Sequence, residues 1–160
     1  MKKTLYIDMD NVLVDFPSGM AACDPALLEQ FKECHDEIPG IFALMQPKPG
    51  AIEAYHELSE LFDTYILSTA PWENPTAWSD KLEWVKRHLG APAHKRLILS
   101  HNKHLNRGHY LVDDRPNNGA EEFGKVPGQE WIRFGPDDHK GWPEVVAYLK
   151  EHAAQSSQEG

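Results

Sequence analysis

Apolar and polar stretches alternate along this chain in a way that predicts strands and helices in turn. Short apolar runs bounded by polar or turn-forming residues predict strands at about residues 3–8, 96–100, 109–113 and 130–134, and another strand that ends at Thr69. Longer segments between them carry apolar residues at the three- and four-residue spacing of helices. This alternation is typical of an α/β fold, in which crossover helices cover a parallel sheet.

Apolar stripes predict three amphipathic helices. The stripes consist of Ile52, Tyr55, Leu58 and Leu61; of Trp78, Leu82, Val85 and Leu89; and of Trp142, Val145, Val146 and Leu149. Gly90 stands where the middle helix would end. We expect Lys81, Lys86 and Arg87 to lie on the solvent side of that helix.

A Pro-containing stretch interrupts the alternation after the first strand. Asp24 and Pro25 are typical of the N-cap and first position of a helix, which we expect to reach about Cys34. We interpret the stretch as a small cap over a site at the carboxyl ends of the strands. The predicted organisation is a core domain of residues 1–15 and 48–154, a cap of residues 16–47 and a frayed tail of residues 155–160.

Length and charge limit the classes of function. The chain has 160 residues, the length of one domain with a single core. Lys and Arg total 16 against 25 Asp and Glu, so the formal net charge is -9. That charge argues against a protein that holds a nucleic-acid polymer by its phosphates. A small phosphorylated metabolite remains compatible, because a bound cation can reverse the charge locally.

Cysteine usage and hydropathy favour a cytoplasmic protein. Cys23 and Cys34 lack the paired spacing of a metal site, which suits a reducing compartment. Lys2 and Lys3 precede an apolar stretch, but Asp8 breaks it too early for a signal peptide. No apolar stretch reaches the length of a membrane span, so we expect no membrane partner.

Carboxylates follow the first strand, and further polar groups follow later ones. Asp8 and Asp10 are two residues apart, so their side chains lie on the same side of an extended chain. Later apolar runs end at Ser68-Thr69, at Ser100 with Lys103 beyond it, and at Asp113-Asp114. In an open α/β sheet, ligands bind outside the carboxyl ends of the strands. We therefore expect these groups to converge on a site for a divalent cation and a phosphate.

Each of these groups also has an ordinary structural interpretation. An acidic pair after a strand is commonly a solvated turn, and a Thr there commonly satisfies that turn. His101 and His104 invite a zinc interpretation, but their surroundings are typical of a loop, so we favour a solvated or substrate-facing role. A receiver-like signalling domain uses similar residues in a different order along the chain.

The order of the motifs resembles that of the haloacid dehalogenase (HAD) superfamily of phosphatases, with Asp-x-Asp, a Ser or Thr, a Lys and a terminal acidic pair. Three segments look more narrowly like those of the 5'(3')-deoxyribonucleotidases: DMDNVLVDF at 8–16, LSTAP at 67–71 and LVDDRP at 111–116. The likeness spans about residues 3–135. It implies an HAD-like, Rossmannoid three-layer α/β fold with a parallel sheet and a small helical cap inserted after the first strand.

The resemblance implies a phosphomonoester hydrolase that works through an aspartyl-phosphate. Asp8 would attack phosphorus. Asp10 would protonate the leaving group, because like charges so close raise the pKa of one member of the pair. Thr69 would donate its hydroxyl to a phosphate oxygen, and Lys103 would balance charge on the nucleophile and the phosphate.

The implied cofactor is Mg²⁺, which prefers octahedral oxygen coordination with several waters. Asp8, the main-chain carbonyl of Asp10 and one member of the pair Asp113 and Asp114 would supply the protein ligands. Which member binds the metal directly is left open at this point.

The implied substrate is a nucleoside monophosphate. Phe16 matches a Phe that stacks on the base, Arg115 matches a substrate-contacting Arg, and the Ala70 amide could donate to the phosphate. Phe42 and Trp72 could complete an aromatic slot, since stacking on a base contributes about 1 to 3 kcal/mol per contact. Core packing is the ordinary alternative for these two rings.

Departures from the family pattern leave the substrate less defined. Asn11 replaces the usual Gly, which is tolerable because Asn enters left-handed backbone conformations readily. Ala70 stands where the animal enzymes tend to have Ser, and the cap is shorter. The alternatives are a phosphatase for another small phosphomonoester, such as a sugar phosphate, and a non-catalytic phosphate-binding relative. The sequence leaves a homodimer open.

Overall fold

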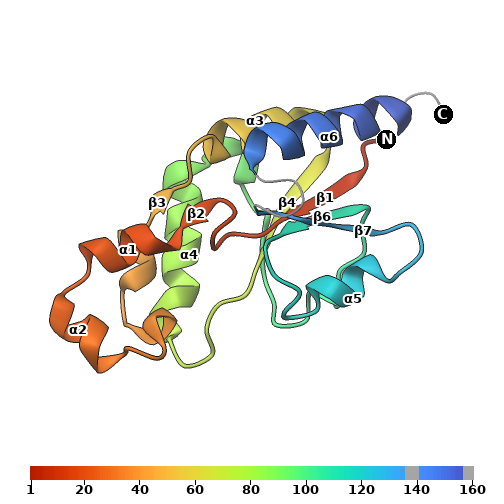
Figure 1. Ribbon diagram of the computed structural model, residues 1–160. Coiled ribbons are helices and arrows are strands. Elements are labelled where there is room, and N and C mark those ends of the chain that lie inside the picture. Colours follow the sequence, from red (N-terminus) through yellow and green to blue (C-terminus); the bar gives the residue numbers. More distant parts are fainter. Residues whose placement is uncertain (136–140, 157–160) are drawn as a thin grey trace.

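A five-stranded parallel sheet forms the centre of the molecule (Figure 1). The computed structural model describes residues 1–135 and 141–156. In spatial order the strands are β5 (Leu97–Leu99), β4 (Asp63–Ser68), β1 (Thr4–Ile7), β6 (Tyr110–Asp113) and β7 (Glu130–Arg133). All neighbouring strands are parallel, and each predicted strand end lies within one residue of the observed one.

The strand order reverses between β1 and β6. From β1 the chain continues to β4 on one side, and it reaches β6 on the other side only later, with Ile7 paired to Val112. Ligands of open α/β sheets bind at such a switch point, outside the carboxyl ends of the strands. Asp8 follows β1 and Asp113 ends β6, so both carboxylates lie at this point.

Helices cover both faces of the sheet and give the three-layer α/β fold that was predicted. Helices α3 (Ala51–Leu61) and α6 (Trp142–Ser156) lie side by side on one face, and α5 (Ala120–Gly124) covers the other (Figure 1). Each face of the sheet has its own cluster of buried apolar residues, because successive side chains of a strand point to opposite faces. On β1, Leu5 and Ile7 belong to the larger cluster, whereas Tyr6 packs with Phe123 in the smaller one. Short 3₁₀ segments η3 (Ala91–Ala93) and η4 (Lys103–Leu105) flank β5.

Two of the predicted apolar stripes need correction. On α6, Trp142, Val145 and Leu149 are buried, as predicted. On α3 the stripe is shifted, with Ala51 and Ala54 buried and Leu61 exposed. On helix α4 (Pro75–His88) the buried face comprises Ala77, Lys81, Trp84 and Val85, while Leu82 is 41% exposed. The expectation that Lys81 faces solvent was wrong, because its side chain is fully buried.

Residues 16–47, which we call the cap after the prediction, lie between β1 and α3 (Figure 1). Strands β2 (Val14–Asp15) and β3 (Gln46–Pro47) pair antiparallel at its base. Between them lie α1 (Phe16–Ala22), α2 (Pro25–Gln30), η1 (His35–Glu37) and η2 (Ile41–Leu44). The Asp24 carboxylate caps α2 by accepting a hydrogen bond from the Ala26 amide at 2.9 Å. Helix α2 ends before the predicted Cys34: Phe31, with φ of -108° and ψ of 29°, has left the helical conformation, and it packs against the core.

Hydrogen bonds fix the cap against α4 and the loop before it. The buried Asn74 amide donates to the carbonyls of Asp36, at 2.9 Å, and Ile38, at 3.0 Å. The Trp84 indole donates to the Met45 carbonyl at 3.1 Å. These bonds satisfy buried polar groups of both partners, so the cap is held as a defined wall beside the sheet.

At the carboxyl end of the chain, α6 continues through Ser156. The predicted frayed tail of residues 155–160 stays a prediction, because residues 157–160 lie outside the described part. Within residues 1–135 and 141–156, no helix combines the length and apolar composition required to cross a membrane.

Candidate active site

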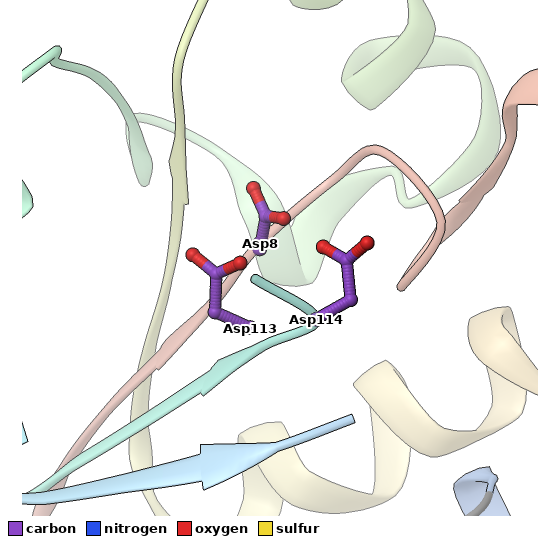
Figure 2. A group of neighbouring side chains, drawn as sticks. All are labelled: Asp8, Asp113 and Asp114. Atoms are coloured by element: carbon purple, nitrogen blue, oxygen red, sulfur yellow. The ribbon is translucent and has the colours of Figure 1, made fainter. Parts of the chain in front are cut away.

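Three carboxylates meet at the switch point of the sheet. Asp8 follows β1, Asp113 ends β6 and Asp114 comes next, and one oxygen from each lies within 4.8 Å of the others. Figure 2 shows the three side chains directed to the same side of the strand ends. A recess of about 20 Å³ beside Asp8 and Asp113 has room for one water-sized occupant, which needs roughly 10–15 Å³. The three carboxylate oxygens are the kind of ligand that a hard divalent cation such as Mg²⁺ prefers.

The Lys103 ammonium bridges two of these carboxylates. Its Nζ lies 3.0 Å from Asp8 Oδ1 and 2.5 Å from Asp113 Oδ2, and the residue is buried. Burial alone would lower the pKa of Lys103, but the two carboxylates outweigh it and raise that pKa. Lys103 is therefore a fixed positive charge at the centre of the cluster.

A tight turn positions Lys103. The Lys103 amide donates to the Asn118 carbonyl at 2.7 Å. Gly119, with φ of +89°, lies so close that a Cβ there would be 2.8 Å from the Lys103 nitrogen. The turn and the lysine loop can approach this closely only because residue 119 has no side chain.

The pKa values of Asp113 and Asp114 are both raised above the ordinary value for an aspartate. Burial, followed by the charge of Asp8, raises the pKa of Asp113 to about 8 and that of Asp114 to about 6. Lys103 opposes the shift at Asp113, and Arg115 opposes it at Asp114. A bound divalent cation would supply the charge that keeps the three carboxylates ionised together.

The Asp10 carboxylate lies outside this cluster and pairs with a different lysine. Lys81 Nζ lies 3.1 Å from each Asp10 oxygen and also donates to Ser68 Oγ at 3.0 Å. The same ammonium lies 4.5 Å from the centre of the Phe42 ring in the cap. Burial, together with the charge of Asp8, raises the pKa of Asp10, although Lys81 opposes the shift. The metal-binding role expected of the Asp10 carbonyl stays a prediction.

Lys81 is one of the site residues that the sequence does not predict. The spacing along the helix indicates that Lys81 is buried. Residues three and four positions apart lie on the same face of a helix, and the buried residues at these spacings from Lys81 are Ala77, Trp84 and Val85. A lysine within an apolar stripe needs a buried anionic partner. That partner, Asp10, is 71 positions away in the chain.

Thr69 lines the recess together with Asp8, Asp10 and Lys103. Its hydroxyl donates to the Ser100 carbonyl at 2.7 Å, so donation to a phosphate, as predicted, requires the hydroxyl to rotate. Ala70 follows it and is fully buried. Asn117 and Asn118, which were not predicted, also line the recess.

A larger cleft of about 440 Å³ adjoins the recess. Asp10, Thr69, Arg115 and Asn118 line both spaces, so the cleft leads outward from the carboxylates. Phe16 lines the cleft, and the Arg115 amide donates to Asp113 Oδ1 at 3.2 Å. Phe16 and Arg115, both predicted to bind substrate, thus line the cleft.

Phe42 and Trp72 do not form the expected slot. Phe42 is buried and packs edge-on against Phe16, with ring centres 5.9 Å apart, so it supports Phe16 from beneath. Trp72 is 74% exposed and packs against His101, with ring centres 5.8 Å apart. Neither ring lines the cleft.

Comparison with known proteins places the chain in a family. The sequence model described as "5' nucleotidase, deoxy (Pyrimidine), cytosolic type C protein" matches residues 22–135. A protein of Vibrio phage KVP40, whose name assigns it provisionally to the 5'(3')-deoxyribonucleotidases, is 55% identical over 148 residues, covering 92% of this chain and 85% of the relative. The human "5'(3')-deoxyribonucleotidase, cytosolic type" is 28% identical over 160 residues, covering 81% of this chain and 78% of that protein.

A solved structure with a similar fold agrees with this placement. A haloacid dehalogenase-like hydrolase of Streptococcus pneumoniae superposes with a TM-score of 0.57 at 12% identity, covering 92% of this chain and 90% of that one. At this identity the likeness concerns the fold. The chain therefore belongs to the 5'(3')-deoxyribonucleotidase family of phosphatases and has the haloacid dehalogenase-like fold.

Proposed function

We propose that this protein is a Mg²⁺-dependent 5'(3')-deoxyribonucleotidase that works through a phosphorylated Asp8. The observation that carries the proposal is the position of the Asp8 carboxylate, held by Lys103 and facing Asp113 and Asp114 at the inner end of a cleft. The family membership supports the same activity.

In the first step an Asp8 oxygen forms a bond to phosphorus while the bond from phosphorus to the ester oxygen breaks. Asp10, with its raised pKa, donates a proton to the leaving sugar oxygen. In the second step water attacks the aspartyl-phosphate, Asp10 takes the proton, and inorganic phosphate leaves with Asp8 restored. Lys103 balances the negative charge near Asp8 throughout.

Asp8, Asp113 and Asp114 would hold the Mg²⁺. When bound, the ion neutralises charge on the phosphoryl oxygens and orients the phosphate toward the nucleophile. Thr69 and Asn118, which line the recess, would bind the remaining phosphate oxygens.

The cleft would hold the nucleoside part of a deoxyribonucleoside monophosphate. Its volume of about 440 Å³ lies within the range of small-ligand sites, about 300–1,000 Å³. Phe16, supported by Phe42, offers a ring face for stacking on the base. The words "deoxy (Pyrimidine)" in the family description favour a pyrimidine substrate.

The test of this function measures phosphate release from two classes of substrate, deoxynucleoside monophosphates and sugar phosphates. Each is assayed with Mg²⁺ and with EDTA. We expect turnover of the nucleotides that requires Mg²⁺. Equal rates on all phosphomonoesters would contradict the nucleotidase assignment, and turnover in EDTA would contradict the cofactor.

The cellular setting is proposed on separate grounds. Cys23 and Cys34 are both free thiols, which is compatible with a reducing cytoplasm. The human relative is described as a cytosolic type. A homodimer stays a prediction, and so does the division of the chain into core and cap domains.

A further inference from the structure

Helix α4 borders a second groove, which lies between this helix and β5. The predicted apolar stripe of α4 lines it: Val85 is buried, but Trp78 is half-buried and Leu82 is 41% exposed. Leu97 and Leu99 of β5 also line the groove, which has a volume of about 990 Å³. None of its described lining residues lines the recess or the cleft, so the groove is separate from the candidate active site.

Strand β5 leaves one edge of the sheet free beside this groove. Within the described part of the chain, β4 is the single neighbour of β5. The Arg96 carbonyl and the Ser100 amide each form a hydrogen bond to β4, at 2.8 Å. Because the main-chain groups of successive residues in a strand point to opposite sides, those of Leu97 and Leu99 point away from β4. Such an edge is a template for a further strand.

Every charged side chain among the described residues that line this groove is basic. Lys86 lies on α4, and His94 and Lys95 precede β5; we call these three residues the basic rim. Arg96 also lines the groove, but it is already bound to Asp63 at 2.7 Å. Within residues 1–135 and 141–156, His94 and Lys95 have no ion pair, and that of Lys86 is exposed and 3.9 Å long. In a chain of net charge -9, this rim is a local reversal of charge that attracts acidic groups.

The basic rim argues against a second copy of this chain as the occupant of the groove. A twofold dimer places the same surface of both protomers in contact, so two basic rims would face each other and repel. Lysines beside an edge strand are one means by which proteins prevent their own copies from pairing there. A peptide of opposite charge is not repelled, so the rim that opposes self-association favours an acidic partner.

We infer that the groove binds an extended acidic peptide of another protein, which adds a strand to the free edge of β5. Main-chain hydrogen bonds to Leu97 and Leu99 supply the affinity in this mode of recognition, and alternate side chains supply the specificity. Apolar side chains of the peptide would lie on Trp78 and Leu82, and its acidic side chains would meet the basic rim. The inference does not depend on the proposed nucleotidase function.

The test follows the fluorescence anisotropy of a labelled heptapeptide as the full protein is added. The peptide consists of three glutamates followed by alternating valine and threonine. We expect saturable binding, and slower hydrogen exchange of the Leu97 and Leu99 amides in the complex. Replacement of one valine and the threonine beside it by prolines should weaken binding about tenfold or more. Since alternate residues of the peptide face β5, one of the two prolines removes an amide that would donate to the strand.

Charge reversal of the basic rim tests the requirement for acidic groups. In the double variant Lys86→Glu, Lys95→Glu we expect binding to be about tenfold weaker, since two attractions become repulsions. Lys32→Glu, Lys125→Glu is the matched control, with the same change of net charge. Its two lysine side chains are 68% and 65% exposed, and neither lines the groove. The control should bind the peptide as the wild type does.

The inference is overturned if the wild type leaves the anisotropy unchanged, if the proline peptide binds as tightly as the probe, or if the double variant binds like the control. Sedimentation velocity of the wild type without peptide tests the other occupant. A dimer whose contact slows exchange of the Leu97 and Leu99 amides would assign the groove to a second copy and would overturn the inference as well.

Discussion

Lys81 and Asp10 form an ion pair that joins α4 to the loop after β1. The lysine is fully buried, the aspartate side chain is 18% exposed, and Nζ lies 3.1 Å from both carboxylate oxygens. The ammonium also contacts Ser68 and the Phe42 ring. One side chain thus connects the proposed general acid with the end of β4 and with the cap.

Replacement of Lys81 by Met tests this connection. Removing one partner of a buried pair leaves an uncompensated charge, so we expect a destabilisation of about 3 kcal/mol in urea unfolding. Because Lys81 lowers the pKa of Asp10, its loss should raise that pKa further. The limb of the kcat profile on which activity falls as Asp10 loses its proton should therefore move to higher pH.

Lys86→Met is the control for this change. Lys86 lies on the same helix with its side chain 65% exposed, so its variant should keep both stability and pH profile. If Lys81→Met lowers stability but leaves the pH profile of kcat where it was, Lys81 has a structural role only and does not tune Asp10.

Gly119→Ala tests how Lys103 is positioned. A Cβ at residue 119 would lie 2.5 Å from His104 Nδ1 and 2.8 Å from the Lys103 nitrogen, so the lysine loop must move. We expect a loss of kcat/KM of about tenfold or more, since small displacements of a catalytic group are costly. Circular dichroism and thermal unfolding would establish that the variant is folded.

Gly128→Ala separates backbone strain from displacement. Gly128 has a similar φ, +83°, but a Cβ there would meet no atom within 4 Å. The variant should lose about 1 kcal/mol of stability or slightly more and keep full activity. Equal activity losses in the two variants would show that strain, and not the contact with Lys103, explains the effect at residue 119.

Mg²⁺ should stabilise the protein more at pH 8 than at pH 6. The folded-state pKa values of Asp113, about 8, and Asp114, about 6, lie above the ordinary value of 3.8. In the metal-free protein, the stability associated with these raised values is present at low pH and lost as the pH rises between about 4 and 8. Protons compete with the cation for the same oxygens, so binding strengthens over this range.

Thermal unfolding with and without MgCl₂ at the two pH values measures this effect. At a concentration one hundred times its dissociation constant, a ligand adds about 2.7 kcal/mol of stability. An Mg²⁺-induced rise in Tm that is as large at pH 6 as at pH 8 would contradict the assignment of the buried acidic pair to the metal site.

The sheet and the meeting of its acidic groups could be predicted from the sequence. Asp8 and Asp113 each end an apolar run, and parallel strands bring such ends to one edge. Asn11 adopts φ of +62°, the left-handed conformation that Asn tolerates better than most residues. These features depend on local patterns and on one rule of topology.

Contacts between distant segments could not be predicted in the same way. The apolar stripe of α4 predicts Lys81 on the solvent side, but the side chain is buried against Asp10, which is distant in the sequence. Phe42 and Trp72 have the same chemistry in the sequence, but one supports Phe16 and the other lies at the surface. Their positions depend on how the cap packs against α4, which spacing along the chain does not specify.

The central claim is that Asp8 is the nucleophile of a Mg²⁺-dependent nucleotidase. The most direct test measures phosphate release from dCMP by the variant Asp8→Asn, with Asp24→Asn as the control. Asn caps a helix as well as Asp does, so the Asp24 variant should match the wild type. We predict that Asp8→Asn loses activity by at least about a thousandfold while remaining folded. Phosphate release by Asp8→Asn at the rate of the Asp24 variant would contradict the account.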